Sequence, residues 1–589
     1  VAPRRTAQPH SRAAAQGDGG CGGGGDGGGG GSGSGSTCAK LGCGQKDSTC
    51  SCDDTCSQIM NCCSDYGSVC RGPAPKLKLG DVNLVVTTDL HSWVGGRKHE
   101  PYLNATLAHA VSLVEQLRIL AREQKRDVFF LDNGDINDGT GLSATAQDHV
   151  DSLAPVMLHA PYDALNIGNH ELYQLNSKGT EPGQACAITA LRDSGYIAAW
   201  GGRYLTSNVV WASSKEPVGS RYTVLKGEFG TNLLTFGFLY NMDDHCDAVE
   251  VEDVNATVHS QWFTEALRAH SPSSHGIVVL AHMDYRDELV DVILAGIRSV
   301  VGLKMPVQFL TGHSHIRGWR RLDNFATSFE AGCKMDTVGF ASFDKVATGD
   351  VPDFYHADID GNTAELASSA NTTKAELLLP EGENFLIALR AAEDALHLGE
   401  TLGCSAKHYR NWAPLDQDDS LWAYYANTVL PATLFEPSGR RQWAVMGTGG
   451  LSYDVYKGPF SRNDAYTTSP FGNFWFTLKG IVGAHLQELL LHLNGGEIGI
   501  DVRRRLSGHV ATPEDRVPNY VATGPLEEAK TYDLIYCDFD SDRVEGLLKQ
   551  ILGSVLPSRL QYRPGSNTSS VLVDWFRTQP CPHEEHTFV

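Results

Sequence analysis

The sequence predicts a layered α/β fold, and three features of residues 80–365 support this prediction. Short apolar runs recur along the segment, each of a length that suits one buried strand. Helical patterns with apolar residues three or four positions apart lie between several of these runs. Each run ends in a short polar loop rich in Asp, Asn and His. Strands that alternate with helices favour an α/β sheet, in which such loops gather at the carboxyl ends of the strands.

The expected elements can be placed in order along the chain. Two helical patterns are carried by Leu107, Val111, Val114 and Leu117, and by Leu289, Ile293, Ile297 and Val300. A further helix is expected within residues 380–400 as a linker. A second mixed unit is expected over residues 402–589, with a strand near 474–478 and a helix over 486–493. The five expected strands are residues 82–86, 128–131, 164–167, 277–280 and 307–310.

Composition excludes some classes of function. The formal net charge of −22 argues against nucleic acid as a partner, since nucleic-acid binders need a basic surface. Such an acidic chain also repels phosphate esters, so a site for them needs bound cations to reverse the local field. No run of about 18 apolar residues occurs, so we expect no membrane span.

The N-terminal part differs from the rest of the chain in composition, being rich in Gly, Ser and Cys. Residues 1–36 form a leader rich in Gly and Ser, which is expected to be flexible. Residues 37–71 are too few to fold around an apolar core, and four disulfides would supply the missing stability. A zinc site is the alternative, but adjacent thiols and the lack of His in this segment fit it poorly. The eight cysteines of this segment are Cys38, Cys43, Cys50, Cys52, Cys56, Cys62, Cys63 and Cys70.

The pattern from Cys50 to Cys70, with its adjacent Cys62-Cys63 pair, resembles the somatomedin B family. This resemblance implies an extracellular module that binds a protein partner. Four glycosylation sequons also suggest a secreted glycoprotein, at Asn104, Asn255, Asn371 and Asn567.

The polar loops after the five apolar runs carry the chemistry. Their sequences are Asp89-Leu-His91, Gly134-Asp135, Gly168-Asn169-His170-Glu171, Ala281-His282 and Gly312-His313-Ser314-His315. Imidazole and carboxylate groups suit Zn, Mn or Fe, and one carboxylate can bridge two ions. Each loop alone would be an ordinary structural feature, but the ordered set of five indicates a site for two divalent metal ions.

This ordered set resembles the calcineurin-like metallophosphoesterases, whose fold has four layers in the order α/β/β/α. The resemblance assigns Asp89, His91 and His315 to a first metal. It assigns Asn169, His282 and His313 to a second metal, with Asp135 as the bridge. His170 would be a catalytic residue that stabilises transition-state charge or protonates the leaving oxygen, while a metal-bound hydroxide attacks phosphorus. Related nucleotidases often carry an Asp two residues after Glu171, but here Tyr173 stands there, which leaves the orientation of His170 unexplained.

Residues 402–589 resemble the smaller α+β C-terminal domain of the 5'-nucleotidases, on the stretches Thr448–Gly458 and Ser469–Asn473. In that family two aromatic rings clamp the base, and Phe471 and Phe539 match their positions. The family's phosphate-binding Arg is replaced by Ser452. Its role would pass to another Arg, for which the candidates are Arg410, Arg440 and Arg441.

The predicted function is therefore that of a secreted, dinuclear-metal phosphoesterase of the 5'-nucleotidase type that acts on nucleoside phosphates. Two alternatives stay open at this point. One is a phosphoesterase for a cyclic nucleotide, a sugar nucleotide or a small phosphomonoester, which the loss of Arg at Ser452 favours. The other is a non-catalytic adhesion protein that uses the domain as a scaffold.

Overall fold

The computed structural model describes residues 38–43, 45, 69–70, 75–100, 102–145, 149–175, 186–345, 350–437, 439–495 and 517–581. Two compact units divide the described chain. The two-sheet unit comprises the described residues up to Thr401 together with residues 461–470. The C-terminal unit comprises residues 402–460 and the described residues from 471 onward. Residues 461–470 thus pack with the two-sheet unit although they follow part of the C-terminal unit in sequence.

The two-sheet unit is built on two six-stranded sheets. The first has the order β14-β13-β1-β2-β3-β4, in which β1 to β4 run parallel. The second has the order β11-β12-β10-β9-β7-β6, in which β12, β10, β9 and β7 run parallel. The first sheet consists of β1 (Val82–Thr87), β2 (Asp127–Asp132), β3 (Ala164–Asn166), β4 (Tyr204–Leu205), β13 (Thr337–Phe343) and β14 (Tyr355–Asp360). The second consists of β6 (Tyr222–Lys226), β7 (Asn232–Leu239), β9 (Gly276–His282), β10 (Val307–Thr311), β11 (Arg317–Asp323) and β12 (Ala326–Ala331).

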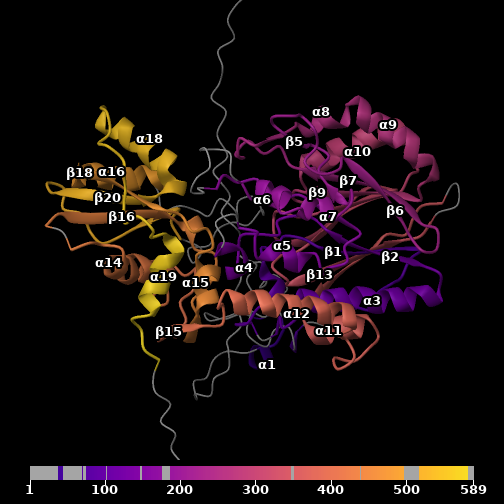
Figure 1. The fold of residues 1–589 in the computed structure, drawn as a ribbon, viewed down its shortest axis with the longest axis horizontal. Helices are drawn as coiled ribbons and strands as arrows, with labels where there is room; N and C mark the ends of the chain where they lie inside the picture. Colours follow the sequence, from indigo (N-terminus) through magenta and orange to yellow (C-terminus); the bar gives the residue numbers. More distant parts are fainter. Residues whose placement is uncertain are drawn as a thin grey trace, which may run out of the picture. The chain divides into compact units, whose positions relative to one another are not determined.

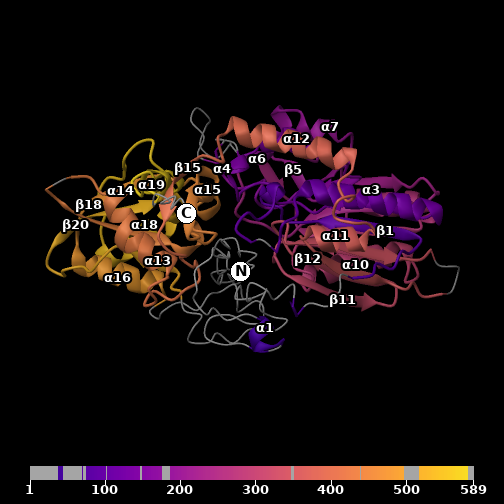
Figure 2. The ribbon, with the colours of Figure 1, turned by 90° about the horizontal axis from the view of Figure 1, so that it is seen from below.

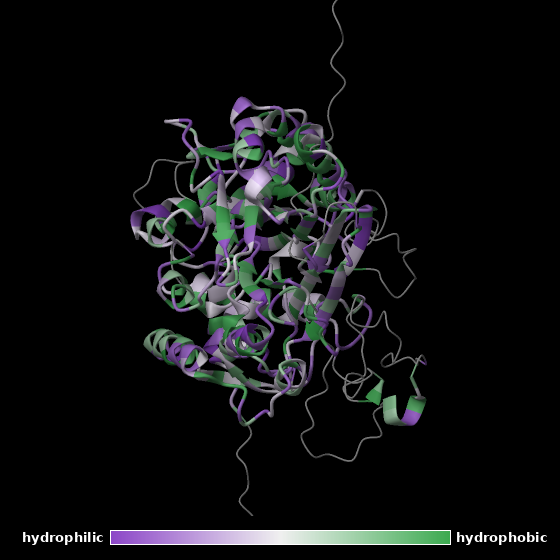
Figure 3. Cartoon of the chain, turned by 90° about the vertical axis from the view of Figure 1, so that its right-hand side faces the viewer, coloured by the Kyte–Doolittle hydropathy of each residue, from purple (hydrophilic) through white to green (hydrophobic). Residues whose placement is uncertain are grey.

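The two sheets pack face to face between outer layers of helices (Figure 1). One apolar cluster joins Leu84 of β1 and Leu131 of β2 to Leu280 of β9 and Leu310 of β10. The inner faces of the two sheets meet in this cluster, and helices cover the outer faces, so the central strands carry apolar residues on both sides. Green, hydrophobic stretches recur along the strands in Figure 3. This arrangement confirms the α/β/β/α prediction.

The helices cover the outer faces. On the first sheet lie α3 (Leu107–Glu123) and α12 (Pro380–Ala395), which run side by side (Figures 1 and 2). On the second sheet lie α9 (Gln261–His270) and α10 (Glu288–Val301). Local sequence explains their ends: Thr106 and His109 form a capping box at α3, and Asp287 caps α10. Shorter elements are α4 (Gly141–Ala144), α5 (Leu153–Met157), α6 (Ala187–Asp193), α7 (Tyr196–Ala199), β5 (Val209–Trp211), β8 (Val249–Val251), α8 (Val254–Val258), α11 (Thr363–Ser369) and α15 (Arg462–Thr468).

The C-terminal unit has a five-stranded sheet in the order β19-β16-β20-β18-β21. Its helices α16 (Gly483–Leu493) and α18 (Ser541–Leu552) pack against this sheet through Leu486, Leu489 and Leu548. The strands are β16 (Arg441–Gly447), β18 (Trp475–Val482), β19 (Tyr520–Ala522), β20 (Thr531–Cys537) and β21 (Leu560–Gln561). The other elements are β15 (Thr401–Ser405), α13 (Leu421–Tyr424), η3 (Tyr425–Val429), α14 (Leu430–Thr433), β17 (Gly458–Ser461) and α19 (Thr568–Phe576).

Disulfides occur in all three parts of the chain. Within the cysteine-rich segment the described pair is Cys43–Cys70, and the short helix α1 (Cys38–Leu41) lies beside it in sequence. The two-sheet unit contains Cys186–Cys246, and the C-terminal unit contains Cys404–Cys581. The other cysteines from Cys50 to Cys63, and residues 1–36, lie outside the described residues. Among the helices that the structure describes, none combines the length and apolar character that a bilayer span requires.

Candidate metal centre

The five polar loops of the two-sheet unit meet at one edge of its sheets. They follow β1, β2, β3, β9 and β10, all of which are parallel strands within their sheets. The strand ends are level, since Thr87 pairs with Asp132 across β1 and β2, and Thr311 pairs with Ala281 across β10 and β9. Parallel strands that end together place their loops around one crevice. The structure therefore brings all seven expected ligand residues together.

The first group of ligands consists of Asp89, His91 and His315, whose candidate ligand atoms lie within 4.8 Å of one another. The Nε2 atoms of His91 and His315 are 3.0 Å apart, and His315 Nε2 is 3.4 Å from Asp89 Oδ1. The second group consists of Asp135, His282 and His313, again within 4.8 Å. Asn169 joins this second group, because its Oδ1 lies 3.1 Å from His282 Nε2.

Asp135 has the contacts of a bridging carboxylate. Its Oδ1 accepts a hydrogen bond from the backbone N–H of His170 at 2.8 Å. Its Oδ2 is buried and lies 3.1 Å from His282 Nε2 and 3.8 Å from His91 Nε2, and while these imidazoles are neutral it has no hydrogen-bond donor among the described residues. A buried carboxylate oxygen without a donor is costly unless a cation faces it. The donor set therefore fits divalent metal ions shared between the two groups.

Backbone hydrogen-bond partners fix the orientation of two imidazoles. His91 Nδ1 lies 3.0 Å from the carbonyl oxygen of Asn137, and His282 Nδ1 lies 2.8 Å from that of Asn133. Because a carbonyl can only accept, each Nδ1 carries the proton and each Nε2 has a lone pair to offer. Metal-binding histidines are held in this way by their second nitrogen. In the neutral imidazoles, both Nε2 atoms therefore face the site as acceptors.

The loops hold their ligands in an unusual backbone conformation. Residues other than Gly rarely adopt positive φ, because Cβ then crowds the backbone. Strain of this kind persists only where the surrounding structure enforces it, and it is concentrated at functional sites. Five of the seven expected ligands have positive φ: Asp89 (51°), His91 (45°), Asp135 (56°), His313 (74°) and His315 (61°).

Two buried carboxyl groups accept hydrogen bonds from the backbone of the ligand loops. Neither had an expected role from the sequence. Glu171 accepts hydrogen bonds from the backbone N–H groups of Asp135 (3.1 Å), Ile136 (2.8 Å) and Gly168 (2.7 Å), which ties two loops together. Glu330 of β12 accepts from the backbone N–H of Ser314 at 3.1 Å and from its hydroxyl at 2.7 Å. Gly168 is required sterically, since a Cβ there would lie 2.1 Å from Asp135 Oδ1.

The orientation of His170 has a direct structural explanation. Its Nδ1 donates a hydrogen bond to Asp138 Oδ2 at 2.9 Å, so Asp138 supplies the carboxylate that is absent at Tyr173. Asp138 lies three residues after Asp135 in the same polar loop, and this proximity was the available sequence signal. One ring nitrogen of His170 lies within 4.8 Å of ligand atoms of His91 and Asp135. The histidine is thus oriented beside both metal groups.

Tyr173 has a different role from the Asp that it replaces. Its hydroxyl accepts a hydrogen bond from Asn169 Nδ2 at 3.1 Å. Because the amide nitrogen is engaged there, Asn169 Oδ1 is directed towards His282 and the second ligand group. The ring of Tyr240, at the end of β7, lies over His313 with the centroids 4.5 Å apart. Two tyrosines therefore hold ligands of the second group in place.

The electrostatics of the site favour added positive charge. Burial lowers the pKa of His282, but the carboxylates of Asp135 and Asp89 outweigh burial and raise it to about 10. Burial and the charge of His282 lower the pKa of His313 to about 3, so this second imidazole stays neutral. One proton on His282 offsets the two carboxylates in the absence of metal, and metal ions would take its place.

The two aromatic residues predicted to bind the substrate base lie at the ends of two neighbouring strands of the C-terminal unit. Phe471 precedes β18 and Phe539 follows β20, and the backbone N–H of Asp538 donates to the carbonyl of Phe474 at 2.9 Å. These paired strands bring the two aromatic residues to the same edge of the sheet. Phe539 is 56% exposed and Phe471 is partly buried. Both rings therefore have surface to offer a ligand.

The candidate arginines are each engaged by a carboxylate. Arg410 binds Asp419 through Nε (2.6 Å) and Nη2 (3.2 Å). Arg440 binds Asp533 in the same manner, and Arg441 pairs with Glu527. Ser452 is buried, and its hydroxyl has no hydrogen-bond partner among the described residues. All three arginine side chains are about half exposed, so exposure does not distinguish between them, and Arg410 stays the predicted substrate residue.

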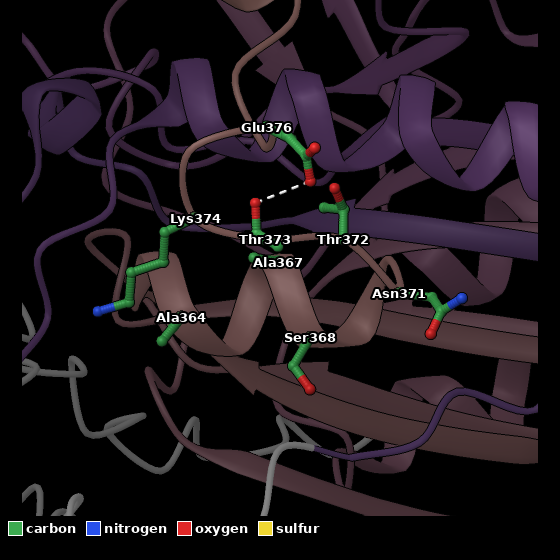
Figure 4. Close-up of a pocket in the computed structure, with 8 residues that line it drawn as sticks. All are labelled: Ala364, Ala367, Ser368, Asn371, Thr372, Thr373, Lys374 and Glu376. Carbon is green, nitrogen blue, oxygen red and sulfur yellow. Dashed lines mark hydrogen bonds between the residues drawn. The ribbon is translucent and has the colours of Figure 1, made fainter.

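A separate surface hollow lies where α11 leads towards α12 (Figure 4). It is lined by Ala364, Ala367, Ser368, Asn371, Thr372, Thr373, Lys374 and Glu376, with a hydrogen bond of 2.8 Å from Thr373 to Glu376. It contains none of the predicted site residues. Asn371, the acceptor of one sequon, points outward at its rim.

Three family models match parts of the chain. Residues 82–317 match the calcineurin-like phosphoesterase family. Residues 407–512 match the C-terminal domain of NAD nucleotidase, and residues 36–73 match the somatomedin B domain. These three matches fall on the three segments in which the sequence resembles the same families.

Known relatives span most of the chain. An uncharacterized protein of Schizosaccharomyces pombe is 25% identical over 544 residues, which is 85% of each chain. A secreted protein of Arthroderma benhamiae is 23% identical over 470 residues, covering 72% of this chain and 69% of its own. The crystal structure of a 5'-nucleotidase from Candida albicans superposes with a TM-score of 0.74 at 22% identity, covering 86% of this chain and all of the other. The shared architecture is that of the nucleotidase fold.

Proposed function

We propose that the protein is a secreted, dinuclear-metal hydrolase of the 5'-nucleotidase type that releases phosphate from nucleoside phosphates. The observation that carries this proposal is the buried Asp135 carboxylate between two groups of ligands. Asp89, His91 and His315 would hold one ion, and Asn169, His282 and His313 the other, with Asp135 bridging. Together, the two metal ions would bind the phosphate oxygens and activate a water molecule for attack on phosphorus.

The protein's own residues supply the rest of the chemistry. His170, with its Nδ1 proton held by Asp138, presents its other ring nitrogen to the transferring phosphoryl group or to the leaving oxygen. A preorganised donor at that position offsets the negative charge that develops in the transition state. In the C-terminal unit, Phe471 and Phe539 would stack on the base, and Arg410 would contact the substrate once its pairing with Asp419 is exchanged.

A second substrate class remains a candidate because Ser452 replaces the family's phosphate-binding Arg. The candidates are a cyclic nucleotide, a sugar nucleotide or a small phosphomonoester. The scaffold alternative finds no support in the site, since all seven ligand residues and His170 are retained and converge. The disulfides, the somatomedin B match and a secreted relative support an extracellular location. A protein partner for the cysteine-rich module is proposed from the family resemblance alone.

The test is phosphate release by the full chain from AMP, ADP, ATP, cyclic AMP and p-nitrophenyl phosphate. Each reaction is run as purified, with chelator, and after Zn or Mn is added back. Chelator-sensitive release that prefers a nucleotide is the expected result. Metal-dependent release from the aryl ester alone would retain the phosphoesterase and exclude the nucleotidase. No release under any metal would favour the scaffold alternative.

A further inference from the structure

His149 contacts the carboxylate that orients His170. Its Nδ1 is hydrogen-bonded to Asp138 Oδ1, the oxygen that His170 does not use. The Asp138 side chain therefore lies between two imidazoles, one on each oxygen. All three side chains are largely buried, with 14% of His149 and 5% each of Asp138 and His170 exposed. Nothing in the chemistry proposed above uses His149.

The geometry gives this contact a specific consequence. A carboxylate held by one partner can rotate about its Cβ–Cγ bond and exchange its oxygens, whereas two donors on opposite oxygens fix its plane. The backbone N–H of Asp138 is also fixed, because it donates to Ser143 Oγ at 3.1 Å. Asp138 and His149 both have positive φ, at 65° and 63°. The loop thus adopts an unfavourable backbone at both residues that form the contact.

We propose that His149 is a positioning residue for the phosphoesterase reaction: it fixes Asp138 so that the carboxylate holds the Nδ1 proton of His170. This assignment rests on the proposed function. His149 is placed to act through Asp138, whose two carboxylate oxygens bind His149 and His170. Its removal should therefore slow turnover and leave substrate binding nearly unchanged. Partners of this kind typically contribute a factor of about 10–100 in activity.

The first measurement is the kinetics of His149→Ala in the metal-loaded full chain, with the ester that the wild type hydrolyses fastest. We expect kcat to fall about 10-fold while KM stays within about twofold. His149→Asn should restore most of the loss, because its amide nitrogen stands near the position of Nδ1 and can donate to Asp138.

The matched control is His275→Ala: His275 precedes β9 at the strand end opposite His282 and accepts from the backbone N–H of Asn232 at 3.1 Å. This control should keep wild-type kinetics.

A double-mutant cycle separates positioning from general stability. If His149 acts only through His170, adding His149→Ala to His170→Ala should cause no further loss of kcat. Multiplicative losses in the double variant, or a His149→Asn variant as slow as His149→Ala, would overturn the assignment while leaving the phosphoesterase intact. A wild type without metal-dependent turnover would overturn the proposed function and this assignment with it.

Discussion

His170 Nδ1 lies 2.9 Å from Asp138 Oδ2, and both side chains are buried beside the ligand groups. This pair affects the pKa of the Asp138 carboxyl. Burial raises the pKa of its carboxyl, but the charges and hydrogen bonds of His149 and His170 hold the pKa below its usual range. The carboxylate is therefore ionised at neutral pH, where it can accept a hydrogen bond from Nδ1 of His170.

Asp138→Asn tests this pair directly. The amide is nearly the same size but carries no charge, so it stabilises a protonated His170 far less. We expect kcat to fall about 10- to 100-fold with little change in KM. Steady-state kinetics with the metal-loaded protein checks this, alongside metal analysis to show that both ions are still bound. A fall in metal content equal to the fall in kcat would instead make Asp138 part of the metal site.

Asp135→Asn should abolish metal-dependent turnover, because an amide cannot bridge two cations with both of its heteroatoms. The expected readout is a loss of bound metal by elemental analysis together with loss of phosphate release. Asp163→Asn is a suitable control, since Asp163 pairs with Arg118 away from the ligand loops. Turnover that survived Asp135→Asn would disprove the metal assignment.

Tyr173→Phe removes the hydroxyl that accepts from Asn169 Nδ2 and leaves the ring in place. The Asn169 amide is then free to rotate, so affinity for the second metal should drop about 10-fold. Titration of the chelated protein with Zn or Mn measures this change. Tyr562→Phe, which loses a tyrosine hydrogen bond to the Leu434 carbonyl in the C-terminal unit, should leave the titration unchanged. Equal effects in the two variants would count against a specific role for Tyr173.

Metal removal should make stability depend on pH with a defined sign. The pKa of His282 is about 10 in the folded protein without metal, and that of an unfolded histidine is about 6.5. Because the folded state holds this proton more tightly, His282 stabilises the fold fully below about pH 6.5, and this contribution is lost as the pH rises towards about 10. Metal displaces the proton and should remove most of the dependence. Unfolding temperatures of chelated and metal-loaded protein across this range test the prediction, and identical profiles would contradict it.

Phe471→Ala and Phe539→Ala should each raise KM for a nucleotide without affecting p-nitrophenyl phosphate. Stacking contributes ~1–3 kcal/mol per base, so each change should cost about 5- to 150-fold in nucleotide kcat/KM. Leu491→Ala is the control, since it removes an exposed apolar side chain from α16 of the same unit. If both substrates respond equally, the rings serve the fold rather than the base.

The sequence by itself determined the five strands that precede the ligand loops, the helices α3, α10, α12 and α16, and the loops that carry the seven candidate ligands. The physical reason is that these depend on local information: apolar runs such as residues 307–310 bury themselves as strands, and Asp and His at their ends are left at the sheet edge. The layer order and the C-terminal domain followed from motif resemblance. The contact from Asp538 to Phe474, which joins the loops of Phe539 and Phe471, required the paired register of β18 and β20.

Only the tertiary structure decided which polar groups support the ligands. Asp138 replaced the carboxylate missing at Tyr173 because the loop turns back at positive φ, which no side-chain periodicity encodes. Glu330 reaches the His313–His315 loop from a strand that follows it in sequence but is parallel to β10 beside it. His149 contacts Asp138 from eleven positions further along the chain. Such contacts depend on the closure of loops in three dimensions, whereas the sequence records only which residues are available for them.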